Sequence, residues 1–498
     1  MFMLMEAIKL HKSILKTTEE KIEIIQNELK NNNDLYIRRF RTISGQNGAL
    51  LFLKGITDEK EINENIFPQL LRMGREEKIT EDFLLETFPY CLLKTSSTKN
   101  EIIDGILTGN IILVLEKLET FCLLNAEKKP ERNPESPIIE TTIKGTKEGF
   151  VESSSVNVSI IRKYLKSPKL QIEDMKIGSL SQTIVTTLFI DGIVNQDVLQ
   201  EVRQRLASIE TDKIISASEL EQWTEDNMWS IFPLVRLSDR PDVAVESLNS
   251  GKVILFVDNS PLALLVPFTF FESLQNMDDY YEKWYVSSMV RIVRLIAMMI
   301  SIFLPSLYVA LIHFNPELIP SDLLVAIAHT RVQVPFPAIW ELLLMELMIE
   351  IFREAGVRLP KPLGQTVGIV GGIVIGEAAV QANIVGPITL IVVGITAMAS
   401  FSTPHYSMAF SFRLLRLLLI IGAGFFGLFG LVLGYIFILL HLSSLKSFGV
   451  PYLVPFAPTK FRNWVDLFIL FPLRFRTMKP TYLADKVKQR KWKQLKRG

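Results

Sequence analysis

The chain has 498 residues, 48% of them hydrophobic and 21% charged, with a formal net charge of +1. This length is too great for one domain and predicts roughly two to four, while the balanced charge excludes a global electrostatic attraction to nucleic acid. The 2 cysteines, Cys91 and Cys122, are too few for a disulfide framework and lie in no metal-type cluster, which favours a reducing compartment for the soluble part.

The N-terminal region is expected to stay inside the cell. Its first residues, MFMLMEAIKL, hold a short apolar run that Glu6 interrupts, and no small-residue cleavage site follows. Residues 1–34 predict a charged helical extension. Residues 35–124 alternate apolar strands, glycine turns and helix starts, which predicts a first soluble α/β subdomain. Residues 125–147 follow as a polar, proline-rich linker.

Residues 148–285 predict a second soluble α/β subdomain that resembles the first. Its segment NSGKVILFVD aligns with LTGNIILVLE, so that Gly251 falls on Gly109, and Gly192 corresponds to Gly55 in the preceding strand and turn. Such self-similarity indicates a tandem duplication. The sequence leaves open the alternative that two apolar strands are alike by chance.

Residues 286–445 have the composition of a transmembrane domain. Ile292–Phe314 is long enough to cross a hydrocarbon core of about 30 Å, and Leu417–Leu442 predicts one long, tilted span. Thr366–Pro387 and Ile384–Phe401 are further apolar segments, while Pro335–Phe352 is apolar but acidic. Together they predict about four to six membrane segments. Whether the acidic segment crosses the membrane or lies at its surface stays open.

Residues 446–498 predict a basic cytoplasmic C-terminal region. Between Arg474 and Gly498 the chain carries ten Lys or Arg residues and one acid. The excess of positive charge places this tail on the inner side of the membrane, where it would either bind anionic lipid headgroups or remain solvated.

No sequence motif in the chain predicts catalysis. Gly422, Gly424 and Gly427 spell GxGxxG, but they lie inside an apolar run and not between a strand and a helix, so they predict close helix packing. No P-loop, HExxH or GxSxG motif occurs, and the five histidines show no ligand spacing. The sequence therefore predicts no enzyme, no metal site and no cofactor.

The stretch TVGIVGGIVIGEAAVQANIVGP places a carboxylate, Glu377, in an apolar, glycine-rich segment. On a helix, Gly368, Gly372 and Gly376 form one smooth stripe suited to helix packing. A second stripe gathers Thr366, Val370, Glu377 and Gln381, flanked by Ile373 and Val374. Because an ionised acid facing lipid costs on the order of 2.5–3.5 kcal/mol, Glu377 should face protein or an aqueous path.

Two interpretations of this acid follow. In the first, an ion path is lined by Val370, Val374, Glu377 and Gln381. In the second, Glu377 is buried and neutralised by a partner such as Arg294 or Arg413. Glu341, Glu346 and Glu350 of the acidic segment are possible vestibule acids that would concentrate cations; otherwise they form the wet face of an interfacial helix.

Three long stretches resemble the A subunit of GerA-type spore germinant receptors. They are TKEGFVESSSVNVSIIRKYLKSPKL, RPDVAVESLNSGKVILFVDNSPLALLVP and the run from PFPAIWELLLMELMIEIF to IVGPITLIVVGITAMASF. The resemblance implies two cytoplasmic α/β subdomains and a multi-helix domain in the spore inner membrane, with both terminal regions cytoplasmic. It also implies a transporter-like B subunit and a lipoprotein C subunit as partners, and a homo-oligomeric ring forming a nutrient-gated channel for monovalent cations.

Other functions remain open at this point. A glycine-rich, interrupted helix with a midplane acid also suits a secondary transporter. The tandem soluble subdomains suit a non-conducting scaffold subunit of the same complex, and a related branch associated with calcium-dipicolinate release shares the same core. The sequence names neither the germinant nor the subunit number.

Overall fold

In the computed structural model the chain forms two compact units. The structure describes residues 17–29, 32–43, 45–71, 88, 92–116, 118, 120–128, 137, 140, 142, 144–358, 376–459, 467 and 469–472. Unit 1 holds the described residues up to Glu225 and Val235–Pro267, and unit 2 holds Asp226–Leu234 and the described residues from Phe268 onward. Within the described residues the chain therefore passes between the units after Glu225, Leu234 and Pro267.

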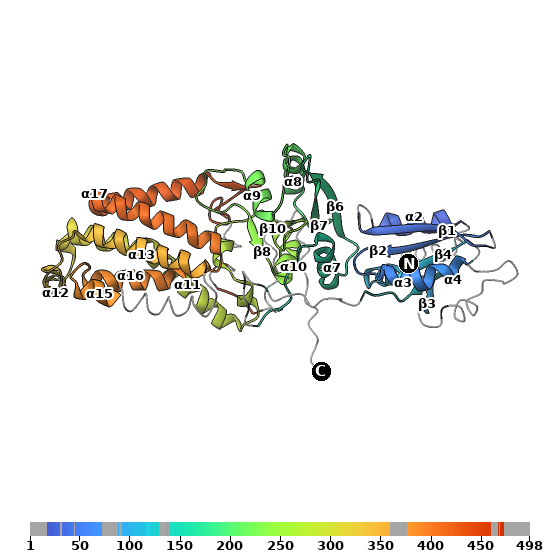
Figure 1. The fold of residues 1–498 in the computed structure, drawn as a ribbon, viewed down its shortest axis with the longest axis horizontal. Helices are drawn as coiled ribbons and strands as arrows, with labels where there is room; N and C mark the ends of the chain where they lie inside the picture. The colour runs from blue at the N-terminus through green and yellow to red at the C-terminus, as the bar shows by residue number, and fades with distance from the viewer. Residues whose placement is uncertain are drawn as a thin grey trace. The chain divides into compact units, whose positions relative to one another are not determined.

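The first part of unit 1 is a five-stranded sheet with the strand order β1-β2-β4-β5-β3. Figure 1 labels the strands β1 to β4 of this sheet. Because side chains alternate across a strand, the sheet has two apolar faces. The helices α2 and α6 cover the face that carries Leu51 and Val114, and η2 and α4 cover the face that carries Leu50 and Leu113. The elements are α2 (Thr18–Glu28), β1 (Leu35–Arg41), β2 (Asn47–Leu53), α3 (Glu59–Glu61), the π-helix η2 (Ile62–Ile66), α4 (Phe67–Leu71), β3 (Leu92–Ser96), α6 (Lys99–Leu107), β4 (Ile111–Leu115) and β5 (Phe121–Leu124).

This subdomain starts earlier than the sequence predicts. We expected residues 1–34 to form a separate extension, but Ile22, Ile25 and Leu29 are buried against the sheet. Thr17 begins the helix with a capping box to Glu20, which satisfies otherwise unpaired backbone donors. The described part of the expected extension is thus an amphipathic helix whose apolar stripe completes the first core.

The second part of unit 1 repeats the topology of the first. Its sheet has the order β6-β7-β9-β10-β8, which is the same order once the strands of each sheet are numbered from one to five. Gly109 and Gly251 precede the equivalent strands β4 and β9 with φ of 91° and 94°, a region that glycine adopts without steric cost. The elements are α7 (Ser154–Tyr164), β6 (Leu170–Ile177), β7 (Thr183–Ile190), α8 (Gln196–Ser208), α9 (Ala217–Thr224), β8 (Arg236–Ser238), α10 (Pro241–Asn249), β9 (Val253–Val257) and β10 (Ala263–Val266).

Both sheets are antiparallel throughout the ladders that the structure describes. We predicted α/β subdomains, a class whose sheets are mostly parallel. The strand-turn-helix pattern in the sequence does not report strand direction, because a helix between two strands fits either arrangement. The repeated topology itself supports the predicted duplication.

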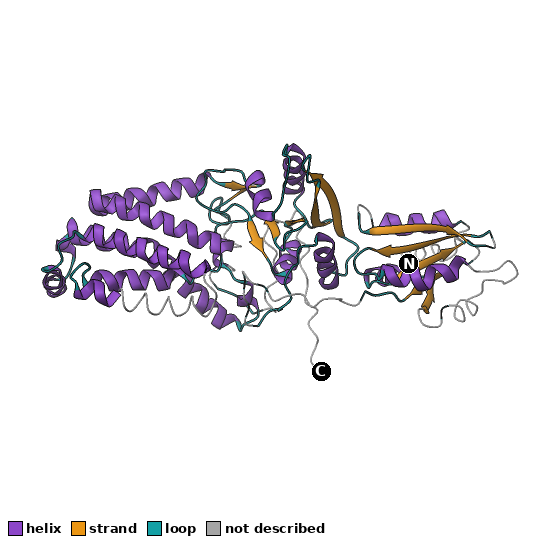
Figure 2. Cartoon of the chain, viewed as in Figure 1, coloured by secondary structure: helices purple, strands orange, loops and turns teal. Residues whose placement is uncertain are grey.

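Unit 2 is mainly helical (Figure 2), and apart from Asp226–Leu234 its described residues run from Phe268 onward. The predicted start of the transmembrane domain at residue 286 stays a prediction. The long helix α11 packs against α13, α16 and α17. The elements are the 3-10 helices η3 (Phe271–Leu274), η4 (Met277–Tyr280) and η5 (Pro316–Leu318), the helices α11 (Trp284–His313), α12 (Ser321–Arg331), α13 (Ala338–Arg358), α15 (Gly376–Gln381), α16 (Pro387–Ser400) and α17 (Tyr406–Ser444), and the short strands β11 (Lys446–Ser447) and β12 (Val450–Pro451).

Helix α17 is folded back on itself at Gly427. The backbone there has φ 62° and ψ −143°, values that essentially only glycine adopts. A Cβ at Gly430 would collide with the carbonyl oxygen of Gly422, and one at Gly434 would lie 2.5 Å from Cδ2 of Leu419. Two antiparallel arms therefore lie side by side (Figure 1). The predicted single span across Leu417–Leu442 is wrong, whereas the glycines do serve the close packing that we expected.

By length and composition, α11 and α17 are the described helices that could cross a membrane, and the shorter α16 is also apolar. The fold at Gly427 divides α17 into arms of 406–426 and 428–444. At about 1.5 Å per residue these arms are roughly 31 and 26 Å long, close to the thickness of a hydrocarbon core. The expected count of four to six membrane segments stays a prediction.

Candidate functional site

Helix α15 carries the described end of the glycine-rich segment. Gly376 and Ala379 are buried, and Ala379 packs in a core shared with α11, α13 and α16. Glu377 and Gln381 lie one helical turn apart on the exposed face, and Nε2 of Gln381 donates a hydrogen bond to Oε1 of Glu377 at 3.1 Å. Because Ala379 faces the core, the side chains of Glu377 and Gln381 project from the opposite face of α15.

A groove of about 590 Å³ runs along this exposed face. Its lining joins α15 to the start of α16 and consists of Gly376, Glu377, Val380, Gln381, Pro387, Leu390 and Ile391. No ion pair joins Glu377 to any residue that the structure describes. The two arginines that we considered as partners of Glu377 form ion pairs with other acids. Arg294 pairs with Asp279, and Arg413 pairs with Glu350.

The structure describes part of the two predicted stripes. Thr366, Gly368, Val370, Gly372, Ile373 and Val374 lie outside the described residues. Of the predicted ion path, the structure therefore describes Glu377 and Gln381 and brings them together. Of the predicted packing stripe it describes Gly376, whose Cβ position would lie 3.6 Å from the methyl groups of Leu390.

Glu341 is buried where α13 meets the start of α16. Its Oε2 accepts hydrogen bonds from the backbone N–H of Gly386 and from Oγ1 of Thr389, both at 2.9 Å. Gly386 is the N-cap of α16, so the carboxylate lies at the positive end of that helix. Nη2 of Arg331 lies 2.8 Å from Oε1 of Glu341, and this charge compensates the acid.

Glu346 and Glu350 are compensated by the first arm of α17. Nη2 of Arg416 lies 2.6 Å from Oε2 of Glu346, and both side chains are buried. Nη1 of Arg413 lies 2.8 Å from Oε1 of Glu350, and Arg353 approaches the same carboxylate at 3.4 Å. These three pairs and the Glu341 pair form an interhelical charge seam, which we define as Arg331, Glu341, Glu346, Glu350, Arg353, Arg413 and Arg416.

The charge seam changes the interpretation of the acidic segment. Charged groups inside a membrane bundle pair with one another because the apolar surroundings penalise an isolated charge. Sequence reasoning named the three acids but assigned none of their partners. The spacing held a usable signal, because Arg413 and Arg416 are three residues apart and Glu346 and Glu350 four apart, so each pair occupies one helix face.

Comparison with known proteins places the chain in a family. The family described as Bacillus/Clostridium GerA spore germination protein matches residues 23–482. The chain belongs to this GerA family. The match spans both subdomains of unit 1 and the helical unit, so it covers the charge seam and Glu377.

Individual relatives are similar along nearly the whole chain. Spore germination protein GerLA of Bacillus cereus is 38% identical over 474 residues, which cover 94% of this chain and 96% of the relative. A Bacillus subtilis (strain 168) protein described as the uncharacterized membrane protein YfkQ is 35% identical, covering 90% and 88%. The crystal structure of the N-terminal domain of the A subunit of the Bacillus megaterium spore germinant receptor GerK3 is 26% identical, covers 52% of this chain and 98% of that one, and has a TM-score of 0.41.

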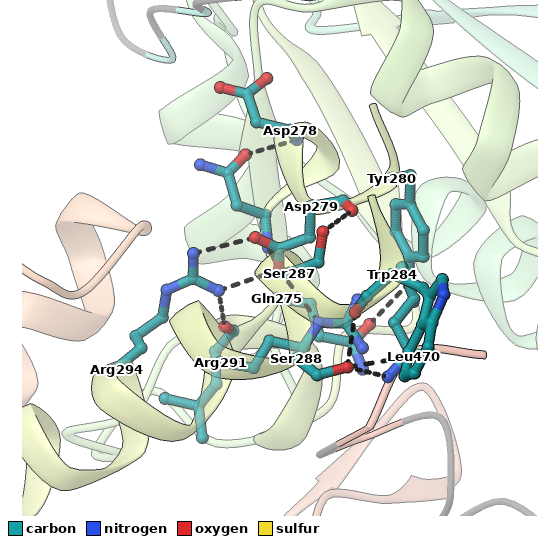
Figure 3. A network of polar contacts seen from close by, with 12 residues as sticks. Gln275, Asp278, Asp279, Tyr280, Trp284, Ser287, Ser288, Arg291, Arg294 and Leu470 are labelled. Atoms are coloured by element: carbon teal, nitrogen blue, oxygen red, sulfur yellow. Dashed lines mark hydrogen bonds and ion pairs between the residues drawn. The ribbon is translucent and has the colours of Figure 1, made fainter. Parts of the chain in front are cut away.

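In this GerA-family chain a second ionic cluster fixes the start of α11. Asp279 of η4 accepts hydrogen bonds from Nε of Arg291 at 3.1 Å and from Nη1 and Nη2 of Arg294 at 3.0 and 3.1 Å (Figure 3). Oγ of Ser287 donates to the carbonyl oxygen of Asp279, and the N–H of Leu470 donates to Oγ of Ser288. One acid thus holds two arginines of the long helix against the preceding 3-10 turn, an arrangement that the sequence did not indicate.

The part of the chain that the structure describes offers no metal centre, since no group of three or more His, Cys, Asp or Glu side chains could hold an ion there. The arrangement can do two other things. The charge seam can hold helices in one register. Glu377, which has no ion-pair partner among the residues that the structure describes, can attract cations wherever water reaches it.

Proposed function

We propose that this chain is the A subunit of a nutrient germinant receptor in the spore inner membrane, and that copies of it form a ring around a nutrient-gated path for monovalent cations. The family supports the receptor assignment. The observation that carries the cation path is the contrast between Glu377, which is exposed and has no ion-pair partner among the described residues, and the paired acids of the charge seam.

The physical argument concerns what the exposed face of α15 meets after assembly. An ionised carboxylate against lipid costs on the order of 2.5–3.5 kcal/mol, whereas a water-filled path between subunits leaves it solvated. A ring of such carboxylates would raise the local concentration of cations. Gln381 would line the same path through its hydrogen bond to Glu377, and Val370 and Val374 would continue it along the predicted stripe.

We assign a different role to Glu341, Glu346 and Glu350. Their compensation by arginines supports a structural function within the bundle, in place of the vestibule that the sequence led us to expect. Removing one member of such a pair leaves an uncompensated charge and is strongly destabilising. The seam would therefore transmit movement of α13 to α12, α16 and α17 as one body.

The family resemblance supports a proposal for the surrounding assembly. We propose a transporter-like B subunit and a lipoprotein C subunit as partners, with the soluble subdomains and the basic C-terminal region in the cytoplasm. A conformational change started by a signal at a partner subunit would then reach the ion path through the helices that the charge seam connects.

The test is the cation current of the assembled receptor in vesicles, or potassium release from spores, compared between wild type and Glu377→Gln. We expect the substitution to lower the current several-fold while the complex still assembles, because it removes the charge and keeps the shape. Leu418→Ala, at an exposed apolar position of α17 outside the groove, is the matched control and should leave the current unchanged. An unchanged current in Glu377→Gln with normal assembly would refute the assignment.

A further inference from the structure

A short loop of the second subdomain belongs to the helical unit. The chain leaves unit 1 after Glu225, contributes Asp226–Leu234 to unit 2, and returns to unit 1 at Val235. Four hydrogen bonds hold this loop. Oγ of Ser411 donates to the carbonyl oxygen of Ile231 at 2.6 Å, and the hydroxyl of Tyr452 donates to that of Pro233 at 2.8 Å. The N–H of Phe448 donates to Asp226, and Oγ of Ser447 donates to Leu234.

The loop is also packed into the helical core. Phe232 is 2% exposed and lies in one cluster with Met298 of α11 and with Phe412 and Leu442 of the two arms of α17. Because each arm contributes to this contact, the loop cannot move independently of the helical hairpin. Its position along the helices is therefore fixed.

Two large side chains at the tip of the loop point away from this core. Trp229 is 84% exposed and Met228 is 78% exposed. Oδ1 of Asn227 accepts a hydrogen bond from the N–H of Trp229 at 3.0 Å, and the carbonyl oxygen of Asn227 accepts one from Ser230. Such a turn favours one backbone conformation at the tip, and in that conformation the side chain of Trp229 is exposed.

The depth of the tip follows from the helix lengths. About 20 residues at ~1.5 Å each cross a hydrocarbon core, so an arm that begins at the fold at Gly427 reaches the opposite boundary near Ser407. Ser411, which binds the loop, then lies roughly 6 Å inside that boundary. Counting back along α11 from His313 reaches the boundary near Arg294, whose cluster with Asp279 is polar. With Gly427 and His313 taken at the far boundary of the proposed membrane domain, both counts put the loop near the opposite membrane-water interface.

We propose that Trp229, with Met228, inserts into the headgroup-acyl boundary of the lipid bilayer and anchors this loop there. Tryptophan favours that boundary because its ring is apolar and its indole N–H can bond to water or headgroups. The partner is the lipid interface, and the inference rests on the proposed insertion of unit 2 in a membrane. The loop is continuous in sequence with unit 1 at both ends.

The experiment is tryptophan quenching in vesicles that contain the assembled protein. Lipids carry a quencher either near the headgroup or deep in the acyl chain, and the signal of Trp229 is the difference between wild type and Trp229→Phe. Trp223→Phe, on helix α9 of unit 1, gives the aqueous control, and Trp340→Phe, exposed on α13 of unit 2, reports whether unit 2 is in the bilayer.

We expect the shallow quencher to remove most of the Trp229 signal and the deep quencher to remove less, with the Trp223 signal unaffected by either. The anchor is excluded if the lipid quenchers reduce the Trp340 signal but not the Trp229 signal. This holds whether Trp229 is in water, where a soluble quencher would reach it, or is covered by another protein. Stronger quenching of Trp229 by the deep label also contradicts it. If neither Trp340 nor Trp229 is quenched, the membrane placement of unit 2 fails together with the anchor.

Discussion

At the scale of single residues, the acids of unit 2 differ in whether a cation compensates them. Glu346 is 6% exposed and its carboxylate lies 2.6 Å from Arg416. Glu377 lies on an exposed face with an amide as its described partner. Since an unpaired charge in apolar surroundings is costly, the two acids should respond to neutralisation in opposite ways. Loss of charge at Glu346 should reduce stability, and loss at Glu377 should reduce function.

Glu346→Gln should destabilise the helical unit by about 3–5 kcal/mol, because it leaves the buried Arg416 without a counter-charge. Thermal unfolding of the purified protein in detergent measures this. The double variant Glu346→Leu/Arg416→Leu should recover most of the loss, since it removes both charges. Glu19→Gln, which breaks the exposed pair with Arg39, is the control and should cost no more than about 1 kcal/mol. An equal effect of the two single changes would contradict a compensated, buried pair.

A second residue-scale prediction concerns pH. Burial raises the pKa of Glu221 from its ordinary value of 4.5 to about 7, and the neighbouring carboxylate of Glu225 adds to the shift. Between these values the folded chain keeps the proton that the unfolded chain releases, so this group's contribution to stability falls as the pH rises from 4.5 to 7. The whole effect is at most ~3 kcal/mol.

Glu221→Gln should flatten this pH dependence and should be more stable than wild type above pH 7. Chemical unfolding at several pH values tests it, with the exposed Glu210→Gln as a variant that should keep the wild-type slope. A slope that survives in Glu221→Gln would assign the pH dependence to another group.

The sequence identified the unusual acids but not their surroundings. Glu341, Glu346, Glu350 and Glu377 stand out in any reading because they interrupt apolar segments. Their partners come from other helices, such as Arg331 on α12 and Arg416 on α17. Spacing along one helix shows that charges share a face, but it does not show which helix packs against that face. For the same reason Asp279, which holds Arg291 and Arg294, carried no signal until the fold placed them together.

At the scale of elements, the reversal at Gly427 divides α17 into two arms, one ending before Gly427 and one beginning after it. The two arms lie together because Gly422, Gly430 and Gly434 leave room for the facing backbone or side chain. A periodicity or hydropathy argument treats glycine as a small apolar residue. It therefore cannot distinguish a glycine in a continuous span from one that adopts φ 62° at a reversal.

Gly427→Ala should destabilise the helical unit by at least ~1–3 kcal/mol, because alanine does not tolerate this backbone conformation. Its Cβ would also lie 2.7 Å from Cβ of Phe314. The matched control is Gly394→Ala in α16, where no atom lies within 4 Å of the added Cβ. There the helix should gain up to ~1 kcal/mol. Equal thermal stability of the two variants would argue for a continuous α17.

At the scale of the whole molecule, the two units differ in architecture, since unit 1 contains two sheets and unit 2 is mainly helical. Unit 1 holds two copies of one topology, with the strand order repeated from β1–β5 to β6–β10. The alignment of Gly251 with Gly109 matches the repeated topology, because both glycines adopt positive φ before the same central strand. The boundaries were less predictable. The loop Asp226–Leu234 belongs to unit 2 although its sequence neighbours belong to unit 1.

The central claim is that the face of α15 with Glu377 meets ions in the assembled receptor. The most direct test introduces Glu377→Cys into a chain whose Cys91 and Cys122 are replaced, and treats the assembled receptor with small thiol reagents of positive or negative charge. We predict that both reagents react, that the positive one lowers the cation current and that the negative one raises it, while Leu418→Cys, at an exposed apolar position of α17 outside the groove, stays unreactive. Absence of reaction at position 377, or reaction with no change in current, would contradict the account.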